Sequence, residues 1–336
     1  MSNYVFKQNA LLGYADSYPG ATSLLETVDF SYSQTFTDST YSKKTLHEQH
    51  NLSESSRISK ANPGNFEFTV NVGTASSTGL NNLITKLLKP DSGTFDLIIS
   101  SGFNLNDHNY TALFQRCVIT NGTFIIDKLE NLKITFTGEC SKLLTGKSPL
   151  YNSVAQVVSG SLGRNYVESQ IPKYVSVKLP NSSAPIPCVT SLSVEVQNDI
   201  EWNPYTTVQK GIENPSDGDI LSIKAFPENY TFKKRIISGS IGAYVKTDPS
   251  FSANGNFGDE PERYLQSYAT NKTLSIIIGD SSTVGFKFNL LNCTYTNRVN
   301  PIEIFTQNYD WRMTDNPLDL TDSSSDSRSY IKIQTT

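Results

Sequence analysis

Apolar and polar residues alternate one by one over many short stretches of this chain. Val28–Tyr32 alternates Val, Phe and Tyr with Asp and Ser, and Phe66–Val72 follows the same period. A period of two places the apolar side chains on one face of a strand and the polar ones on the other. Further strands are expected at "SGTFDLIIS", "TALFQRCVIT" and "LKITFTGEC". The pattern predicts a mainly β protein whose sheets have one dry and one wet face.

One stretch between these strands has a helical period instead. From Leu80 to Leu88, leucine and isoleucine stand at positions i, i+3, i+4, i+7 and i+8, which form one apolar stripe. Thr78 is a suitable N-cap, and Pro90 is expected to end the helix. We therefore expect one helix packed on the first set of strands.

The same order of elements returns in the second half of the chain. Cys188–Ile200 alternates, Arg235–Val245 follows a polar stretch, and a helix capped by Asp259 is expected to bury Leu265 and Tyr268. Strands are then expected at "TLSIIIGD", "GFKFNLLNCTYTN" and "EIFTQNYDWRMTD". "LFQRCVITNG" and "KFNLLNCTYTN" share a Phe, a later Cys and a closing Thr-Asn. We infer two similar β-sandwich or barrel domains, each with one packed α-helix.

The expected domains are residues 1–146 and residues 174–315. A linker at residues 147–173 joins them, and residues 316–336 form a polar C-terminal extension. The acidic part of this extension is expected to be a solvated tail that ends in a short strand at "YIKI".

Each predicted domain contains a long polar segment near its start. Thr37–Asn65 and Ile200–Asn229 show no apolar period, so we expect structureless loops. Loops of this length inside a compact domain are usually functional or disordered. Such segments gain order when they pack on another subunit, which favours an assembly protein over a catalyst.

Composition excludes several classes of protein. The chain has 336 residues, a formal net charge of -4 and only 18% charged residues, so it lacks the basic face with which proteins bind nucleic-acid phosphates. No apolar run approaches the roughly 20 residues that span a bilayer, and the N-terminus lacks a signal-peptide pattern. We expect a soluble chain that is not exported through a signal peptide.

Motifs for catalysis or metal binding are weak. His47 and His50 in "HEQH" do not have the zincin spacing, and no Walker loop, dinucleotide fingerprint or Gly-x-Ser-x-Gly elbow occurs. The four cysteines form no close pairs, which excludes a zinc knuckle and a dithiol motif; they are Cys117, Cys140, Cys188 and Cys293. We expect no enzyme activity, no cofactor and no metal site.

The order of strand, long loop, strand, helix and further strands resembles the tail tube domain. This domain occurs in major tail tube proteins of long-tailed, siphophage-like bacteriophages and in tube proteins of related contractile secretion machines. The most similar stretch is "RIISGSIGAYVKTDPSFSANGNFGDEPERYLQSYATNKTLSIIIGD". The resemblance is one of element order, covers Ser23–Cys140 and Cys188–Asp315, and corresponds to a tube protein in which the domain is duplicated.

The resemblance implies a structural virion protein whose stacked rings surround a lumen that conducts DNA at ejection. In the family, sheets of neighbouring subunits join into a continuous inner barrel, and three duplicated chains make a pseudo-sixfold ring. The implied partners are further copies of the chain, other tail proteins at the tube ends and DNA in transit, without membrane insertion. The implied location is the virion tail, assembled in the host cytoplasm.

The resemblance also assigns roles to particular residues. Thr37–Asn65 and Ile200–Asn229 would be the inter-ring loops, with these candidate contacts: Lys43, Lys44, Arg57, Trp202 and Tyr205. DNA must slide without sticking, so the lumen should avoid net positive charge. The wet-face carboxylates are the lumen candidates: Asp29, Glu67 and Glu195. The alternative for these three is a position on the outer surface or against a neighbouring chain.

Two other functions stay open at this stage. A related tail ring, such as a baseplate hub or tail terminator, would differ from the tube only in its place in the virion. A carbohydrate-binding β protein or adhesin would need a shallow aromatic site, for which Trp202, Tyr205 and Trp311 are the candidates. The simpler role for these aromatic side chains is packing in the core or at an interface.

Overall fold

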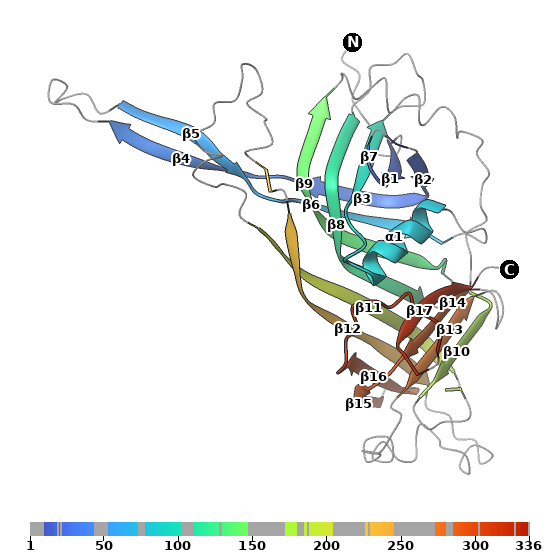
Figure 1. Ribbon diagram of the computed structural model, residues 1–336. Coiled ribbons are helices and arrows are strands. Elements are labelled where there is room, and N and C mark those ends of the chain that lie inside the picture. Colours follow the sequence, from blue (N-terminus) through green and yellow to red (C-terminus); the bar gives the residue numbers. More distant parts are fainter. Residues whose placement is uncertain are drawn as a thin grey trace, which may run out of the picture.

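The computed structural model confirms a mainly β chain built from antiparallel strands (Figure 1). It describes residues 10–18, 20, 22–43, 53–72, 78–101, 111–127, 130–146, 172–179, 185–186, 188–203, 226–227, 229–244, 273–279, 285–301, 303–325 and 327–334. One α-helix is present in this part of the chain. The second predicted helix, from Asp259, lies outside it.

The first half of the chain contributes nine strands and the helix. Their bounds are β1 Ala10–Ala15, β2 Thr22–Leu25, β3 Thr27–Ser33, β4 Phe36–Lys43, β5 Ser53–Ala61, β6 Gly64–Asn71, α1 Thr78–Leu88, β7 Phe95–Ser101, β8 Thr111–Asp127 and β9 Lys133–Gly146. The second half contributes β10 Tyr174–Lys178, β11 Val189–Trp202, β12 Tyr230–Tyr244, β13 Leu274–Gly279, β14 Gly285–Leu290, β15 Cys293–Pro301, β16 Phe305–Met313 and β17 Tyr330–Gln334.

A central sheet of eight strands runs through both halves in the order β3-β6-β9-β8-β11-β12-β16-β15. The early part of β8 also pairs with β7, which continues to β1 and β2 and forms the first outer sheet. The second outer sheet has the order β10-β13-β14-β17. The outer sheets lie on one face of the central sheet, so the fold is of β-sandwich type and the central sheet is not closed into a barrel.

The strand order of the first half recurs in the second half. The central sheet takes β3-β6-β9-β8 from one and β11-β12-β16-β15 from the other. Of these four strands in each half, the spatial order is each time the first, second, fourth and third along the chain. The outer pairings β1-β7-β8 and β10-β13-β14 also correspond. The expected domain boundaries themselves stay a prediction.

Helix α1 forms as the apolar stripe predicts. Its buried residues include Leu80, Leu83, Ile84, Leu87 and Leu88, which face the core side of the central sheet. Helix α1 can approach β8 closely because β8 has a glycine, Gly122, beneath the helix. A Cβ atom at this position would lie 2.2 Å from Leu87 Cδ2. One contiguous hydrophobic core joins both halves, with Phe124 of β8 packed edge-on against Phe286 and Phe288 of β14.

Two sequence expectations are wrong. The segment Thr37–Asn65 is not a structureless loop, because β4 and β5 pair with each other over most of it. The acidic C-terminal extension is not a solvated tail: Leu320 is fully buried, and its N–H donates to Leu88 O at 3.2 Å. The strand expected at "YIKI" is confirmed as β17, which completes the second outer sheet beside β14.

Candidate assembly surface

The side of the central sheet opposite α1 carries a continuous polar face. One row of directly paired residues crosses all eight strands, namely Asp29, Thr69, Thr135, Thr123, Glu195, Ser238, Arg312 and Thr294. A row on one side of it holds Ser31, Glu67, Thr137, Asn121 and Gln197 and continues on β12 with Ile236. The row on the other side holds Lys133, Ile125, Ser193, Ser240, Asp310 and Thr296, so each of these two rows contains one isoleucine. None of these side chains is buried. We call these rows the polar face.

Hydroxyl and amide groups dominate the polar face and bond to one another across strands. Thr69 and Thr135 hydroxyls lie 3.0 Å apart, and Ser193 and Ser240 hydroxyls lie 2.9 Å apart. Carboxylates of the face also have partners: Asn121 Nδ2 donates to Glu195 Oε1 at 2.8 Å. At the far edge Arg298 Nη2 lies 3.0 Å from Asp310 Oδ2. The face is thus hydrophilic without a dense cluster of either charge.

The three predicted lumen residues share this face. Asp29 and Glu195 stand in the same paired row, and Glu67 stands in the adjacent row. Alternation along the strands was the signal that grouped them. The register that aligns Asp29 with Glu195 across five strands required the structure, because the pairing of β8 with β11 is not visible in the sequence.

Both edges of the central sheet present unshared strands. Within the described residues, β3 pairs only with β6, and β15 pairs only with β16. Exposed apolar side chains lie at each edge: Val28 of β3 is 55% exposed, and at the β15–β16 turn Ile304 and Phe305 are 59% and 53% exposed. An open strand edge with apolar groups is a template for pairing with another chain.

Strands β4 and β5 form a two-stranded arm that projects from the body of the molecule (Figure 1). We call residues 36–61 the arm. Its register pairs Phe36 with Ala61 at the root and Lys43 with Ser53 near the tip. An isolated two-stranded hairpin is marginally stable in water at best, so the arm gains stability if it lies on another surface.

The root of the arm is fastened to both halves of the chain. Gln34 Nε2 donates to Asn62 O at 2.9 Å and to Ser141 O at 3.1 Å, and its Oε1 accepts from the Leu143 N–H at 3.0 Å. The Phe36 ring packs edge-on against Phe226, which belongs to the second half. The direction of the arm is therefore set at its base.

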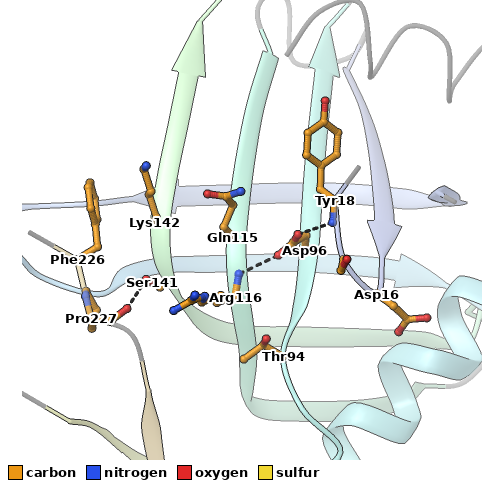
Figure 2. A pocket seen from close by; sticks show the side chains of 11 residues that line it. Asp16, Tyr18, Thr94, Asp96, Gln115, Arg116, Ser141, Lys142, Phe226 and Pro227 are labelled. Atoms are coloured by element: carbon orange, nitrogen blue, oxygen red, sulfur yellow. Dashed lines mark hydrogen bonds between the residues drawn. The ribbon is translucent and has the colours of Figure 1, made fainter. Parts of the chain in front are cut away.

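A cavity of about 380 Å³ lies beside this root (Figure 2). Asp96 braces its wall: its Oδ2 accepts the Tyr18 N–H at 2.7 Å and its Oδ1 accepts the Arg116 N–H at 2.8 Å. Burial raises the pKa of Asp96 above its usual value, and these two backbone hydrogen bonds oppose that rise. Arg116 has a positive φ of 56°, so Asp96 holds a backbone conformation that is costly for a non-glycine residue. The geometry gives Asp96 a bracing role.

The two halves are joined at the C-terminal end of α1 by the buried Arg235 of β12. Its guanidinium donates to Leu87 O and Leu88 O, each at 3.0 Å, and to two carbonyls of the C-terminal extension, Pro317 O at 2.9 Å and Leu318 O at 2.8 Å. Arg235 Nε donates to Asn198 Oδ1 at 2.8 Å. Burial lowers the pKa of Arg235 to about 10, so the side chain stays cationic at neutral pH and caps the helix.

The predicted inter-ring contacts are distributed over the arm and the end of β11. Lys43 and Arg57 lie in the strands of the arm, whereas Lys44 and Tyr205 lie outside the described residues. Trp202 ends β11 instead of starting a loop, and its Nε1 donates to Glu139 Oε2 at 2.6 Å. Trp311, a candidate for a carbohydrate site, is buried in the core.

The described residues contain no helix that is long and apolar enough to cross a membrane. Within the same ranges, no group of three or more His, Cys, Asp or Glu side chains is placed to hold a metal ion.

No protein-family model and no curated protein matches the chain. Among solved structures, it is similar to a chain of the cryo-EM structure of the anti-feeding prophage (AFP) baseplate, 6-fold symmetrised. The sequences are 12% identical, the TM-score is 0.31, and the alignment covers 44% of this chain and 97% of that one.

Proposed function

We propose that this chain is a structural, non-catalytic subunit of a bacteriophage tail, and specifically the tail tube protein. Three copies close into a ring, rings stack into a tube, and DNA passes through the lumen at ejection. The observation that carries the proposal is the central sheet: eight strands with one polar row that crosses all of them, and edge strands that are paired on one side within the described residues.

Ring closure follows from the open edges and the repeated topology. Open β edges invite another chain, and a ring is the arrangement that leaves none unpaired. Head-to-tail contacts close when the rotation per copy divides a full turn. Because each chain contains the same strand order twice, a ring of three chains presents six similar units.

The polar face supplies a suitable lining for the lumen. A wall rich in cations would hold DNA through counterion release, with a strong salt dependence. Here Ser, Thr, Asn and Gln side chains fill most positions of the paired rows, and Glu195 is hydrogen-bonded to a neutral amide. DNA would meet a hydrated surface without a basic track.

The arm is the proposed contact between successive rings. It extends beyond the body, and its root is rigidly held by Gln34 and Phe36. A neighbouring ring would supply the surface that a two-stranded hairpin needs. This role replaces the loop contact expected from the sequence and keeps the same segment.

Negative-stain electron microscopy of the purified chain tests the function, with two arm variants as the internal comparison. One variant removes residues 40–56 and joins Ser39 to Arg57, its register partner, through an Asn-Gly turn. The other removes only residues 44–52 and joins Lys43 to Ser53, which are also paired. We expect tubes from the natural chain and single rings from the longer deletion. Tubes of normal length from the longer deletion would exclude the arm as the ring-to-ring contact.

A further inference from the structure

The two halves can be aligned residue by residue from two independent landmarks. The register of β3 skips one residue between Thr27 and Asp29, and that of β11 skips one between Val189 and Ser191. Asp29 and Ser191 are the first paired residues after these two β-bulges, so we treat them as equivalent positions of the two halves.

The second landmark lies within β8 and immediately before β15. Arg116 and Asn292 both have positive φ, at 56° and 54°, and each precedes a buried cysteine. Cys117 Sγ donates to Phe114 O, three residues earlier, and Cys293 Sγ donates to Leu290 O with the same spacing. Cys117 therefore corresponds to Cys293. The strand pairings lead from Cys117 across β9 and β6 to β3, and from Cys293 across β16 and β12 to β11. Followed in this way, the second landmark also makes Asp29 equivalent to Ser191, so the two alignments agree.

The chain contains one example of how such halves join. Strand β8 of the first half pairs with β11 of the second in antiparallel register from Asn121–Gln197 to Asp127–Ser191. By the alignment, β15 corresponds to the end of β8, and β3 corresponds to β11. These two counterparts are the strands at the edges of the central sheet, each paired on one side within the described residues. We call these edges the open edges.

Burial at equivalent positions is lower near the edges of the described sheet than at the closed junction. Leu192 and Val194 of β11 are fully buried at the closed junction. Their counterparts Phe30 and Tyr32 of β3 are only half-buried at the open edge. Leu132, which immediately precedes β9, is buried, whereas its counterpart Phe305 at the start of β16, next to the edge strand β15, is exposed.

We propose that β15 of one copy pairs with β3 of a second copy in the register of the β8–β11 junction. Strand β8 has one extra residue at the register shift between Ile119 and Asn121, whereas the β15–β16 pairing has no shift. Ile125 and Thr123 therefore correspond to Asn300 and Arg298, and Ser193 and Glu195 correspond to Ser31 and Ser33. The junction pairs Ile125–Ser193 and Thr123–Glu195 then place Asn300 opposite Ser31 of the second copy and Arg298 opposite its Ser33. All four side chains are exposed in the single chain. The proposal rests on the proposed ring function and specifies its interface.

The same register explains the exposed apolar side chains at both edges. In the closed junction the end of β8, at Asp127, lies opposite the start of β11, at Ser191. Correspondingly, the β15–β16 turn with Ile304 and Phe305 would meet the start of β3 in the second copy, where Val28 is exposed. Apolar groups from opposite edges would then cover one another, as burial of apolar surface favours.

Cysteine cross-linking tests the register with four double variants made from the same four substitutions. The background carries Cys188→Ser, because Cys188 is the exposed native cysteine. The matched pairs are Asn300→Cys with Ser31→Cys and Arg298→Cys with Ser33→Cys. The swapped pairs are Asn300→Cys with Ser33→Cys and Arg298→Cys with Ser31→Cys. Each is assembled, oxidised with copper phenanthroline and separated on non-reducing gels.

We expect covalent dimers and trimers from the matched pairs, formed at least about fivefold faster than from the swapped pairs. Residues directly opposite have Cβ atoms about 4.5–5.5 Å apart, whereas diagonal neighbours are about 7–8 Å apart and cannot easily form a disulfide. Mixing two single variants should give dimers but no trimers, which shows that the bond is between chains.

The outcomes separate this proposal from the function. Electron microscopy of the same samples reports whether rings form. Rings with faster cross-linking of the swapped pairs, or with no cross-linking of any pair, would overturn the register and leave the ring function standing. Neither rings nor cross-links would overturn both.

Discussion

The closed junction between β8 and β11 and the open edges at β3 and β15 are two versions of the same structural position. At the junction, inward side chains such as Val194 are fully buried, and the polar row continues from Thr123 to Glu195 without a break. At the edges, equivalent aromatic side chains are half-covered. The difference teaches that, within the described residues, equivalent side chains are less covered at the edge strand β3 than at the junction, and the proposed ring would supply a contact like the β8–β11 junction there.

The largest expected effect breaks the joint between the halves. Replacing Arg235 by Met removes the donors to Leu87 O and Leu88 O and leaves buried carbonyls unsatisfied, which should lower the free energy of unfolding by about 4 kcal/mol. Urea denaturation followed by circular dichroism measures this change. Lys233→Met, on the same strand but exposed, is the matched control and should leave the midpoint unchanged. Equal effects of the two substitutions would show that the Arg235 network does not hold the halves together.

The next effect concerns the helix that covers the first half. Leu87→Ala should destabilise the chain by about 3 kcal/mol, because it leaves a cavity against Gly122. Gly122→Ala should also destabilise it, since the new Cβ would clash with Leu87 Cδ2. The double variant should cost less than the sum of the two, and denaturation of all three measures the coupling. Thr85→Ala, on the exposed side of α1, is the control; strict additivity would argue against this contact.

A smaller effect separates assembly from stability at the open edges. Phe305→Ser and Ile304→Ser should each weaken ring formation by about tenfold or more, because the lost apolar contact is worth about 1.5–3 kcal/mol when fully buried. Unfolding of the single chain should be unchanged. Light scattering across a concentration series measures assembly, and Leu318→Ser, another exposed apolar position, is the control. A loss of unfolding stability that matches the loss of assembly would place these side chains in the fold instead of the interface.

The smallest effect is a pH dependence at the C-terminal extension. Burial tends to raise the pKa of Asp319, but hydrogen bonds from Thr321 and Lys89 outweigh it and lower the pKa to about 2. A carboxylate with a depressed folded pKa adds stability above its unfolded pKa of about 3.9, and this contribution is lost as the pH falls from about 4 to 2. Asp319→Asn should therefore remove part of the stability at pH 7 and reduce the difference between pH 7 and pH 2. An unchanged acid unfolding curve would contradict this role.

Local pattern was enough to predict several parts of the fold. Alternation located β3, β6 and β11 and placed Asp29, Glu67 and Glu195 on polar strand faces, and the helical stripe located α1. The arm was missed because polar residues stand at both odd and even positions of the β4 and β5 sequences, so no contrast reveals the period of two. The C-terminal extension was misjudged because one buried side chain, Leu320, fixes it within a polar run.

Long-range pairing could not be predicted from the sequence. The contact between β8 and β11 joins strands about 70 residues apart along the chain, and nothing in either strand marks the other as its partner. In the sequence, the stretches around Cys117 and Cys293 showed only a loose similarity. In the structure, the residue before each of these cysteines has a left-handed backbone conformation. This shared feature could be recognised only from the backbone angles.

The mass of the assembled ring tests the central claim most directly. Native mass spectrometry of the arm-deleted chain, combined with top views from electron microscopy, measures the number of chains in one closed ring. The account predicts three chains, each close to the natural 37.2 kDa less the deleted segment, arranged as six similar lobes around a lumen. A chain that stays monomeric at high concentration, or a ring with a different number of chains, would contradict it.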